Sequence, residues 1–140
     1  MSELALPPVI GTTENALRSL LRQLLSSTAI GGYDEWVYLN IRDAADDVTR
    51  AEASVADALK QPVAAAAAAR SRLFEAGLLD AAGALTQLGH DELRHGRELI
   101  SATTRALTAG IEPARLRAAV EILDTVRLRA ENHLRDADGR

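Results

Sequence analysis

The side chains with the clearest chemical potential in this sequence are basic and polar groups that lie between Val48 and Leu79. Guanidinium, ammonium, amide and hydroxyl groups bind phosphate oxygens and the edges of bases, which makes these residues candidates for contacts with double-stranded DNA. The candidate DNA-binding residues are Arg50, Lys60, Gln61, Arg70, Ser71 and Arg72. An alternative stays open, in which these charges are ordinary solvated surface and Arg70 lays its aliphatic stem across the core.

A second pattern with chemical meaning is the pair Glu92 and His95, whose spacing puts two metal ligands on one face of a helix. A di-metal bundle needs a second copy of this pair and two further glutamates, but the residue three before His133 is Ala130. The sequence also lacks a recognisable nucleophile beside a base, a glycine-rich phosphate loop and a carboxylate pair. We therefore predict no metal, no cofactor and no enzymatic activity.

Two predicted helices and the corner between them position the basic residues. At the start of the first helix, Thr49 and Glu52 have the spacing of a capping box, in which each side chain bonds the backbone N–H of the other residue. Apolar residues at helical spacing continue this helix to Leu59. Lys60 and Gln61 then form the corner.

The second of these helices contains six consecutive alanines, residues 64–69. Pro62 opens it, because the first turn of a helix does not need the N–H that proline lacks, and Gly77 ends it just after Ala76 in a left-handed conformation. Two short helices with so brief a connection predict a helix-turn-helix, in which the second helix takes the position that reads DNA.

The rest of the chain is predicted to be almost entirely helical, because alanine is abundant and β-branched residues are few. We expect an extended arm through Gly11, followed by helices over residues 12–27, 33–45, 87–109 and 113–134. The exception is the segment from Leu78 to Thr86, where two short apolar pieces around Gly83 predict a minimal β-hairpin, or wing. With 140 residues the chain has room for a single domain.

Composition limits the compartment and the classes of partner. The chain has no cysteine, which excludes disulfides and thiolate metal sites and is typical of a cytosolic protein. No apolar run approaches the length of a membrane span, and the N-terminus lacks the pattern of a secretory signal. We therefore predict a cytoplasmic protein without a membrane partner. The formal net charge of −4 weakens the case for nucleic acid but does not close it, because acidic regulators can carry local basic patches.

Four short motifs occur in an order and spacing that resemble one family of regulators. They are Glu35-Trp36-Val37-Tyr38-Leu39, Ala76-Gly77-Leu78-Leu79, Ala84-Leu85-Thr86-Gln87-Leu88-Gly89-His90 and Gly110-Ile111-Glu112-Pro113. Over nearly its whole length the chain resembles the MarR family of winged-helix transcriptional regulators. The resemblance implies a homodimer in which two winged helices bind a palindromic operator, often with a small-molecule effector pocket between the dimerisation and DNA-binding regions.

The fold that this resemblance implies is mainly α: a winged helix-turn-helix with N- and C-terminal helices that form a dimerisation region. It places one domain over residues 1–140. Residues 12–30 and 87–134 are the expected dimerisation helices, and residues 33–86 are the expected helix-turn-helix with a wing reduced to a short β-hairpin. The candidate ligand-binding residues for the effector are Tyr33, Trp36 and Tyr38, with plain core or interface packing as the alternative for the tryptophan.

The chain departs from the family pattern on the surface that should meet DNA. At about 100° per residue, the predicted reading face carries mostly methyl groups, where side chains such as Arg, Asn or Gln normally contact base edges. That face contains Ala64, Ala65, Ala68, Ser71, Arg72 and Glu75, and the opposite face contains Val63, Ala66, Ala67, Arg70 and Phe74. The wing offers Asp80 and no basic residue.

Two functional hypotheses remain after this comparison. The first is a dimeric MarR-like transcriptional regulator that binds DNA and responds to a small-molecule effector. The second is a winged-helix homodimer whose DNA-reading face has degenerated and which binds a protein or a ligand instead. The alanine run fits both hypotheses, because alanine also favours helix and tight packing.

Overall fold

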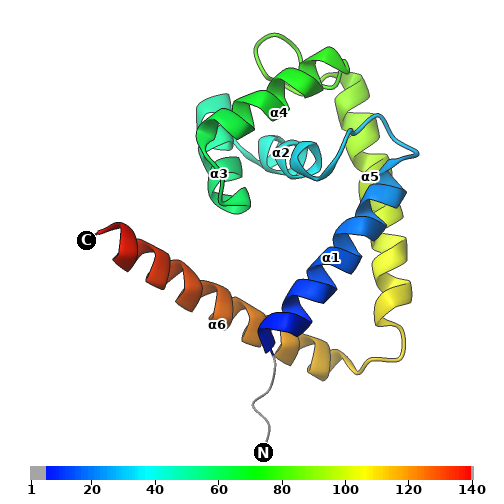
Figure 1. Cartoon of the computed structure of the whole chain (residues 1–140). Helices are drawn as coiled ribbons and strands as arrows, with labels where there is room; N and C mark the ends of the chain where they lie inside the picture. The colour runs from blue at the N-terminus through cyan, green and yellow to red at the C-terminus, as the bar shows by residue number, and fades with distance from the viewer. Residues whose placement is uncertain (1–5, 140) are drawn as a thin grey trace, which may run out of the picture. The chain divides into compact units, whose positions relative to one another are not determined.

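The computed structural model describes residues 6–139 of the chain (Figure 1). Within that range it contains six helices and no β-strand: α1 (Leu6–Leu25), α2 (Tyr33–Ala44), α3 (Val48–Leu59), α4 (Val63–Glu75), α5 (Gln87–Thr108) and α6 (Pro113–Asp138). The prediction of a mainly α fold is confirmed. The chain divides into two compact units, the first ending at Thr103 and the second beginning at Thr104. None of the described helices combines the length and the apolar character that a membrane crossing requires.

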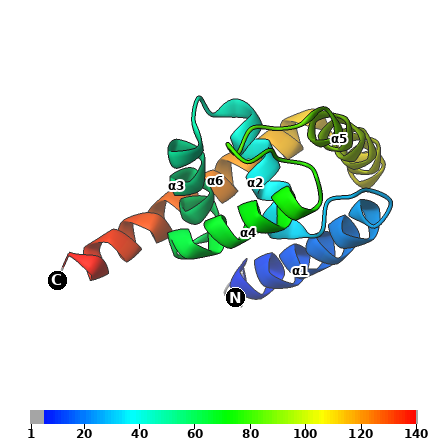
Figure 2. The same ribbon diagram turned by 90° about the horizontal axis from the view of Figure 1, so that it is seen from above.

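The core of the first unit lies where α2, α3 and α4 pack against one another, with α1 in contact with α2 (Figure 2). It is aliphatic and alanine-rich, as the composition predicts, and Tyr38 is the only fully buried aromatic side chain among the described residues. The buried cluster consists of Leu25, Ile30, Tyr38, Leu39, Val55, Ala66, Ala69, Leu73, Leu78, Leu79 and Leu93. Because Ala66 and Ala69 present only methyl groups, α4 can lie close to its neighbours.

Helix α1 begins earlier than the sequence pattern predicts. The described chain is already helical at Leu6, with Pro7 and Pro8 in the first turn, so the prediction of an extended arm through Gly11 is wrong for these residues. Proline is compatible with a first turn, whose N–H groups have no partner within the helix. The hydroxyl of Thr12 donates to the carbonyl of Pro8 at 2.9 Å, a bond within the helix rather than a cap. The first five residues of the predicted arm lie outside the described range.

The start of α3 uses a different cap from the predicted capping box. The side chain of Asp47 accepts a hydrogen bond from the backbone N–H of Arg50 at 2.8 Å, so Asp47 is the N-cap and Thr49 already lies inside the helix. Aspartate is at least as good an N-cap as threonine. Glu52, the other half of the predicted box, points instead toward partners on α2 and α4. The capping-box prediction is therefore wrong.

The ends of α4 and α5 lie close to where the sequence places them. Pro62 is the N-cap residue of α4, and Gly77 follows the helix with a φ of +79°. Thr86 caps α5, because its Oγ1 accepts from the N–H of Gly89 at 3.0 Å, and its hydroxyl donates to the carbonyl of Gly77 at 2.6 Å. One threonine thus ties the start of α5 to the end of α4. Gly110, with a φ of +80°, follows the end of α5 as predicted.

The predicted β-hairpin wing is wrong, and with it the winged part of the fold prediction. Between α4 and α5 the described chain forms one isolated antiparallel bridge, between Leu79 and Leu85, and no strand. Gly77 and Thr86 already serve the ends of the flanking helices. Too few residues are left on either side of the loop to build a ladder of backbone hydrogen bonds.

Side-chain hydrogen bonds hold the loop at the predicted wing tip. Oδ1 of Asp80 accepts from the backbone N–H groups of Ala82 and Ala84, at 2.9 and 3.0 Å. Gly83 has a φ of +82°, and its carbonyl accepts from Nε of Arg42 at 2.8 Å. The loop is therefore closed on its own aspartate and fixed to α2 by an arginine.

We predict that Gly89→Ala destabilises the first unit. A Cβ at residue 89 would lie 2.1 Å from the backbone oxygen of Leu78, and backbone atoms cannot move aside as a flexible side chain can. The expected loss is about 1–3 kcal/mol in the free energy of unfolding, measured by urea denaturation. Gly11→Ala is the matched control within α1: no heavy atom lies within 4 Å of its Cβ, so stability should stay equal or rise. A neutral Gly89→Ala would contradict this packing.

Candidate nucleic-acid interface

The predicted corner between α3 and α4 is confirmed by the backbone. Lys60 has a φ of +53°, a left-handed conformation that residues with a side chain adopt uncommonly. Its N–H donates to the carbonyl of Asp57 at 3.1 Å, and the N–H of Gln61 donates to the carbonyl of Ala56 at 3.0 Å. These bonds satisfy the last carbonyls of α3 and turn the chain sharply into α4.

One side of helix α4 is buried and the opposite side is exposed to solvent. Its buried residues are Ala66, Ala69 and Leu73, whereas Ala64, Ala68 and Ser71 on the outer side are exposed. The prediction that placed Phe74 and Val63 on the inward face is wrong, because Phe74 is 52% exposed and Val63 is 55% exposed. Both lie roughly a quarter turn away from the buried side. The outer surface of α4 is therefore made of methyl groups, one hydroxyl and an exposed phenyl ring.

The surface at the corner carries two of the six candidate DNA-binding residues, Lys60 and Gln61, and the outer side of α4 carries a third, Ser71. A fourth, Arg50, is exposed in the first turn of α3, at the other end of that helix from the corner. The side chain of Arg50 is 76% exposed, with Nε 3.9 Å from Oδ2 of Asp47. Nζ of Lys60 lies 3.1 Å from Oδ1 of Asp57, and Gln61 is exposed beside it. Exposed ion pairs of this kind contribute little to stability, on the order of 0–1 kcal/mol, so either cation can exchange its partner for a phosphate. The hydroxyl of Ser71 donates to the carbonyl of Ala67 at 3.2 Å.

Arg70 lies at one edge of the buried side of α4 and binds a carboxylate from α3. Its Nε is 3.0 Å from Oε1 of Glu52, which also accepts a hydrogen bond from the hydroxyl of Tyr38 on α2 at 3.2 Å. Burial raises the pKa of Tyr38 to about 12, and the charge of Glu52 contributes further in the same direction. Tyr38 therefore stays a neutral donor, and one carboxylate joins side chains from three helices.

Arg72 lies at the other edge of the buried side and makes the same kind of contact with α2. Its Nε forms a close ion pair with Oε1 of Glu35, a buried acid in the first turn of α2. The positive end of the α2 dipole stabilises a negative charge at that place. Both arginines of α4 thus have carboxylate partners from neighbouring helices, and the two arginines do not point to a common site.

Glu35 and Glu52 belong to this interface although the sequence pattern does not indicate them. Glu52 has the spacing of a capping box, which conceals its contact with Arg70. The one available signal is Arg70 itself, because an arginine amid apolar positions commonly ends at a carboxylate. Nothing local indicates Glu35, which lies 37 residues from Arg72 in the chain.

The charge balance of this region opposes tight binding of a polyanion. Residues 33–86 contain five basic and nine acidic side chains, a net charge of −4. Binding to DNA depends largely on the number of phosphates that cationic side chains neutralise. Any contact with DNA must therefore be local, through individual side chains around α4, rather than through a broad basic surface.

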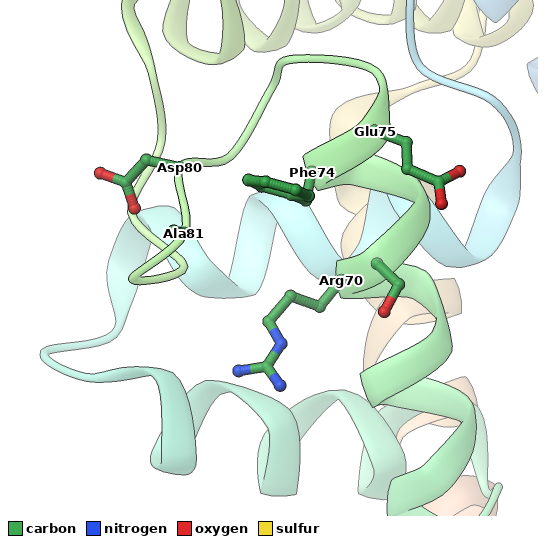
Figure 3. A pocket seen from close by; sticks show the side chains of 6 residues that line it. Arg70, Phe74, Glu75, Asp80 and Ala81 are labelled. Carbon is green, nitrogen blue, oxygen red and sulfur yellow. The ribbon is translucent and has the colours of Figure 1, made fainter.

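A surface hollow of about 400 Å³ lies beside α4. Figure 3 shows the ring of Phe74 between α4 and the loop that carries Asp80 and Ala81, with the side chain of Arg70 leaving the helix one turn earlier. Glu75 and Ser71 complete the lining. The hollow combines an apolar ring, one cationic group and two acidic groups.

The three candidate ligand-binding residues do not form one site. Tyr38 is fully buried, and Trp36 is partly buried against the core, close to Gly96 of α5. Tyr33 is at the surface, where its ring lies beneath the guanidinium of Arg18 at 4.4 Å. It lines two neighbouring hollows of about 250 and 220 Å³. Both are smaller than the roughly 300–1,000 Å³ of typical ligand pockets, so the effector stays a prediction.

Comparison with known proteins adds no relative. No protein-family model, no curated protein and no solved structure matches this chain. The resemblance to the MarR family therefore rests on the sequence motifs alone.

Within residues 6–139, no cluster of three or more His, Asp or Glu side chains could hold a metal ion.

We predict that the hydroxyl of Tyr38 ionises at a higher pH than an ordinary tyrosine and that its hydrogen bond to Glu52 stabilises the fold. Its pKa in the folded protein, about 12, lies above the ordinary value of 10.0, so this contribution is complete below pH 10 and is lost as the pH rises from 10 to 12. Tyr38→Phe should lower the free energy of unfolding by about 1 kcal/mol at neutral pH. The difference in ultraviolet phenolate absorbance between wild type and Tyr38→Phe isolates this group. A phenolate that appears near pH 10 in folded protein would contradict the arrangement.

Proposed function

We propose that this chain is a subunit of a homodimeric DNA-binding regulator of the helix-turn-helix class. The observation that carries the proposal is the corner at Lys60, which joins α3 to α4, a helix whose outer side is exposed to solvent. Exposed donors lie at the corner (Gln61), on the outer side of that helix (Ser71) and in the first turn of α3 (Arg50). The resemblance of the sequence motifs to MarR regulators supports the same function.

The proposed mode of binding depends on phosphate contacts more than on base contacts. Ala64 and Ala68 can touch the methyl group of thymine, but they offer no donor or acceptor to a base edge. Arg50 and Lys60 are cations that can bind the backbone in any sequence. We therefore expect modest affinity, modest sequence selectivity and a clear dependence on salt.

Fluorescence anisotropy with labelled duplex DNA tests this proposal. Duplexes from the region upstream of the chain's own gene should bind more tightly than a scrambled duplex of equal length, and binding should weaken as salt rises. Replacing Arg50 by Gln should make the slope of log K against log salt less negative by about 1, because one phosphate contact is lost. Asn15→Gln, a surface change on α1 that keeps the charge, serves as the control. Absence of binding at the lowest salt concentration would rule out DNA as the partner.

The homodimer belongs to the proposal because of the apolar surface of α6. None of the 26 residues of α6 is buried. Its apolar positions Leu116, Val120, Leu123, Val126, Ala130 and Leu134 recur at three- and four-residue spacing, which is typical of a helix that packs along another helix. Leu17 of α1 is also half-exposed. A second copy of the chain would remove such apolar surface from water.

We expect Leu123→Glu and Leu20→Glu to dissociate the homodimer. Leu123 is 48% exposed in the single chain, and a carboxylate at that position would have to be buried without a partner in a dimer. Thr125→Glu is the matched control, because Thr125 lies on the opposite side of α6 and bonds the carbonyl of Glu121. Light scattering at micromolar concentration should give a dimeric mass for wild type and Thr125→Glu and a monomeric mass for the leucine variants. A monomeric wild type would refute the dimer.

A second candidate function is the binding of a protein partner through the outer side of α4. The exposed ring of Phe74 and the methyl groups of the outer face favour it, because these groups gain more from an apolar partner than from a groove of DNA. The net charge of −4 over residues 33–86 favours it as well. The anisotropy experiment separates the two candidates, since only the first requires salt-dependent binding of duplex DNA.

A further inference from the structure

The two arginines of α4 are more exposed to solvent than their acidic partners are. The Glu52 side chain is 13% exposed and that of Arg70 is 42% exposed. For Glu35 and Arg72 the values are 10% and 52%. In both pairs the carboxylate is enclosed by the protein, whereas the guanidinium reaches the surface.

The enclosed carboxylates have interactions of their own that keep them in place. Glu52 accepts a second hydrogen bond from the buried hydroxyl of Tyr38. Glu35 lies in the first turn of α2, where the helix dipole favours an acid. A guanidinium has five N–H donors in a planar fork, and each of these arginines meets its carboxylate through Nε. The arginine is therefore the partner that can turn toward an incoming anion.

We propose that Glu52 and Glu35 are counter-ions that set the affinity of α4 for DNA. They neutralise Arg70 and Arg72, so a phosphate must compete with a fixed carboxylate for each arginine. This inference rests on the proposed DNA-binding function and specifies how that function is regulated. Neither glutamate is required to touch the DNA.

Arg70 is the arginine whose position makes this competition direct. It lines the hollow beside Phe74, between α4 and the loop at Asp80 (Figure 3). A phosphate that enters this hollow meets one cation, which is already paired with Glu52. The carboxylate of Asp80 is bound to the backbone of its own loop. Removing the charge of Glu52 leaves the cation uncompensated, whereas removing the charge of Glu75 only weakens a repulsion.

The test is a cycle of variants at Glu52 and Arg70, measured by anisotropy with the same duplex at several salt concentrations. Glu52→Gln keeps an oxygen that can accept from Tyr38 but removes the charge. We expect the affinity of Glu52→Gln for the duplex to be about threefold higher than that of Glu75→Gln. Its slope of log K against log salt should be more negative by about 1, because Arg70 gains a phosphate contact. In the Arg70→Gln background the same substitution removes only a long-range repulsion, so its effect should fall to that of Glu75→Gln.

Glu75→Gln is a suitable control because it removes the same charge from α4 at an exposed position that has no ion pair with any described residue. Thermal unfolding of each variant shows whether its fold is kept. If Glu52→Gln does not fold, Glu35→Gln and Arg72→Gln provide the same cycle at the second pair.

The outcomes separate this inference from the function on which it rests. Wild-type binding with equal effects of Glu52→Gln and Glu75→Gln would overturn the counter-ion role and leave DNA binding intact. An effect of Glu52→Gln that persists unchanged in the Arg70→Gln background would overturn it as well. Absence of binding by both wild type and Glu52→Gln at the lowest salt would overturn the function and the inference together.

Discussion

One polar contact joins the three packed helices of the first unit, where Tyr38 of α2, Glu52 of α3 and Arg70 of α4 meet. Burying a carboxylate is costly unless donors surround it, and here a hydroxyl and a guanidinium supply them. The surrounding core is aliphatic and alanine-rich, and methyl surfaces constrain the orientation of helices only weakly. A directional contact between three helices therefore fixes their relative orientation, which the aliphatic core does not. Among the described residues no buried side-chain polar atom lacks a partner.

The same contact shapes the outer surface of α4. Arg70 and Arg72 lie at the two edges of the buried side and bind Glu52 and Glu35, so the outer side consists of methyl groups, the hydroxyl of Ser71 and the ring of Phe74. In the DNA-binding role that we propose for α4, the geometry of the helix and the chemistry of its outer side are therefore separate properties. The geometry comes from the corner and the close packing of α4, whereas the chemistry is weakened by the acids that hold the same helix in place.

The second unit presents the opposite case, a helix with little packing of its own. Helix α6 has no buried residue, yet Val120, Leu123 and Leu134 along it are apolar and half-exposed. Apolar residues that are exposed to water raise the free energy of the protein, and another surface that covers them lowers it again. The homodimer that we propose would satisfy this constraint with no component other than a second copy of the chain.

The sequence by itself determined the helices and most of their ends. Pro62, Gly77, Thr86 and Gly110 act through the dihedral angles and hydrogen bonds of single turns, so their effect can be predicted without the rest of the fold. The beginning of α1 was missed because proline is compatible both with an extended arm and with a first helical turn. The prediction of a wing was wrong because Gly77 and Thr86, at the two ends of that segment, serve the neighbouring helix ends.

Only the tertiary structure decided which side of α4 is buried and which carboxylates its arginines bind. Phe74 is exposed because packing against α2 and α3 selects a particular side of the helix, which a window of local periodicity does not identify. Glu35 and Arg72 lie 37 residues apart, and Tyr38 and Glu52 lie 14 apart. Such pairs form only when helices cross at a particular angle and register, and that crossing is a property of the packed core rather than of any one segment.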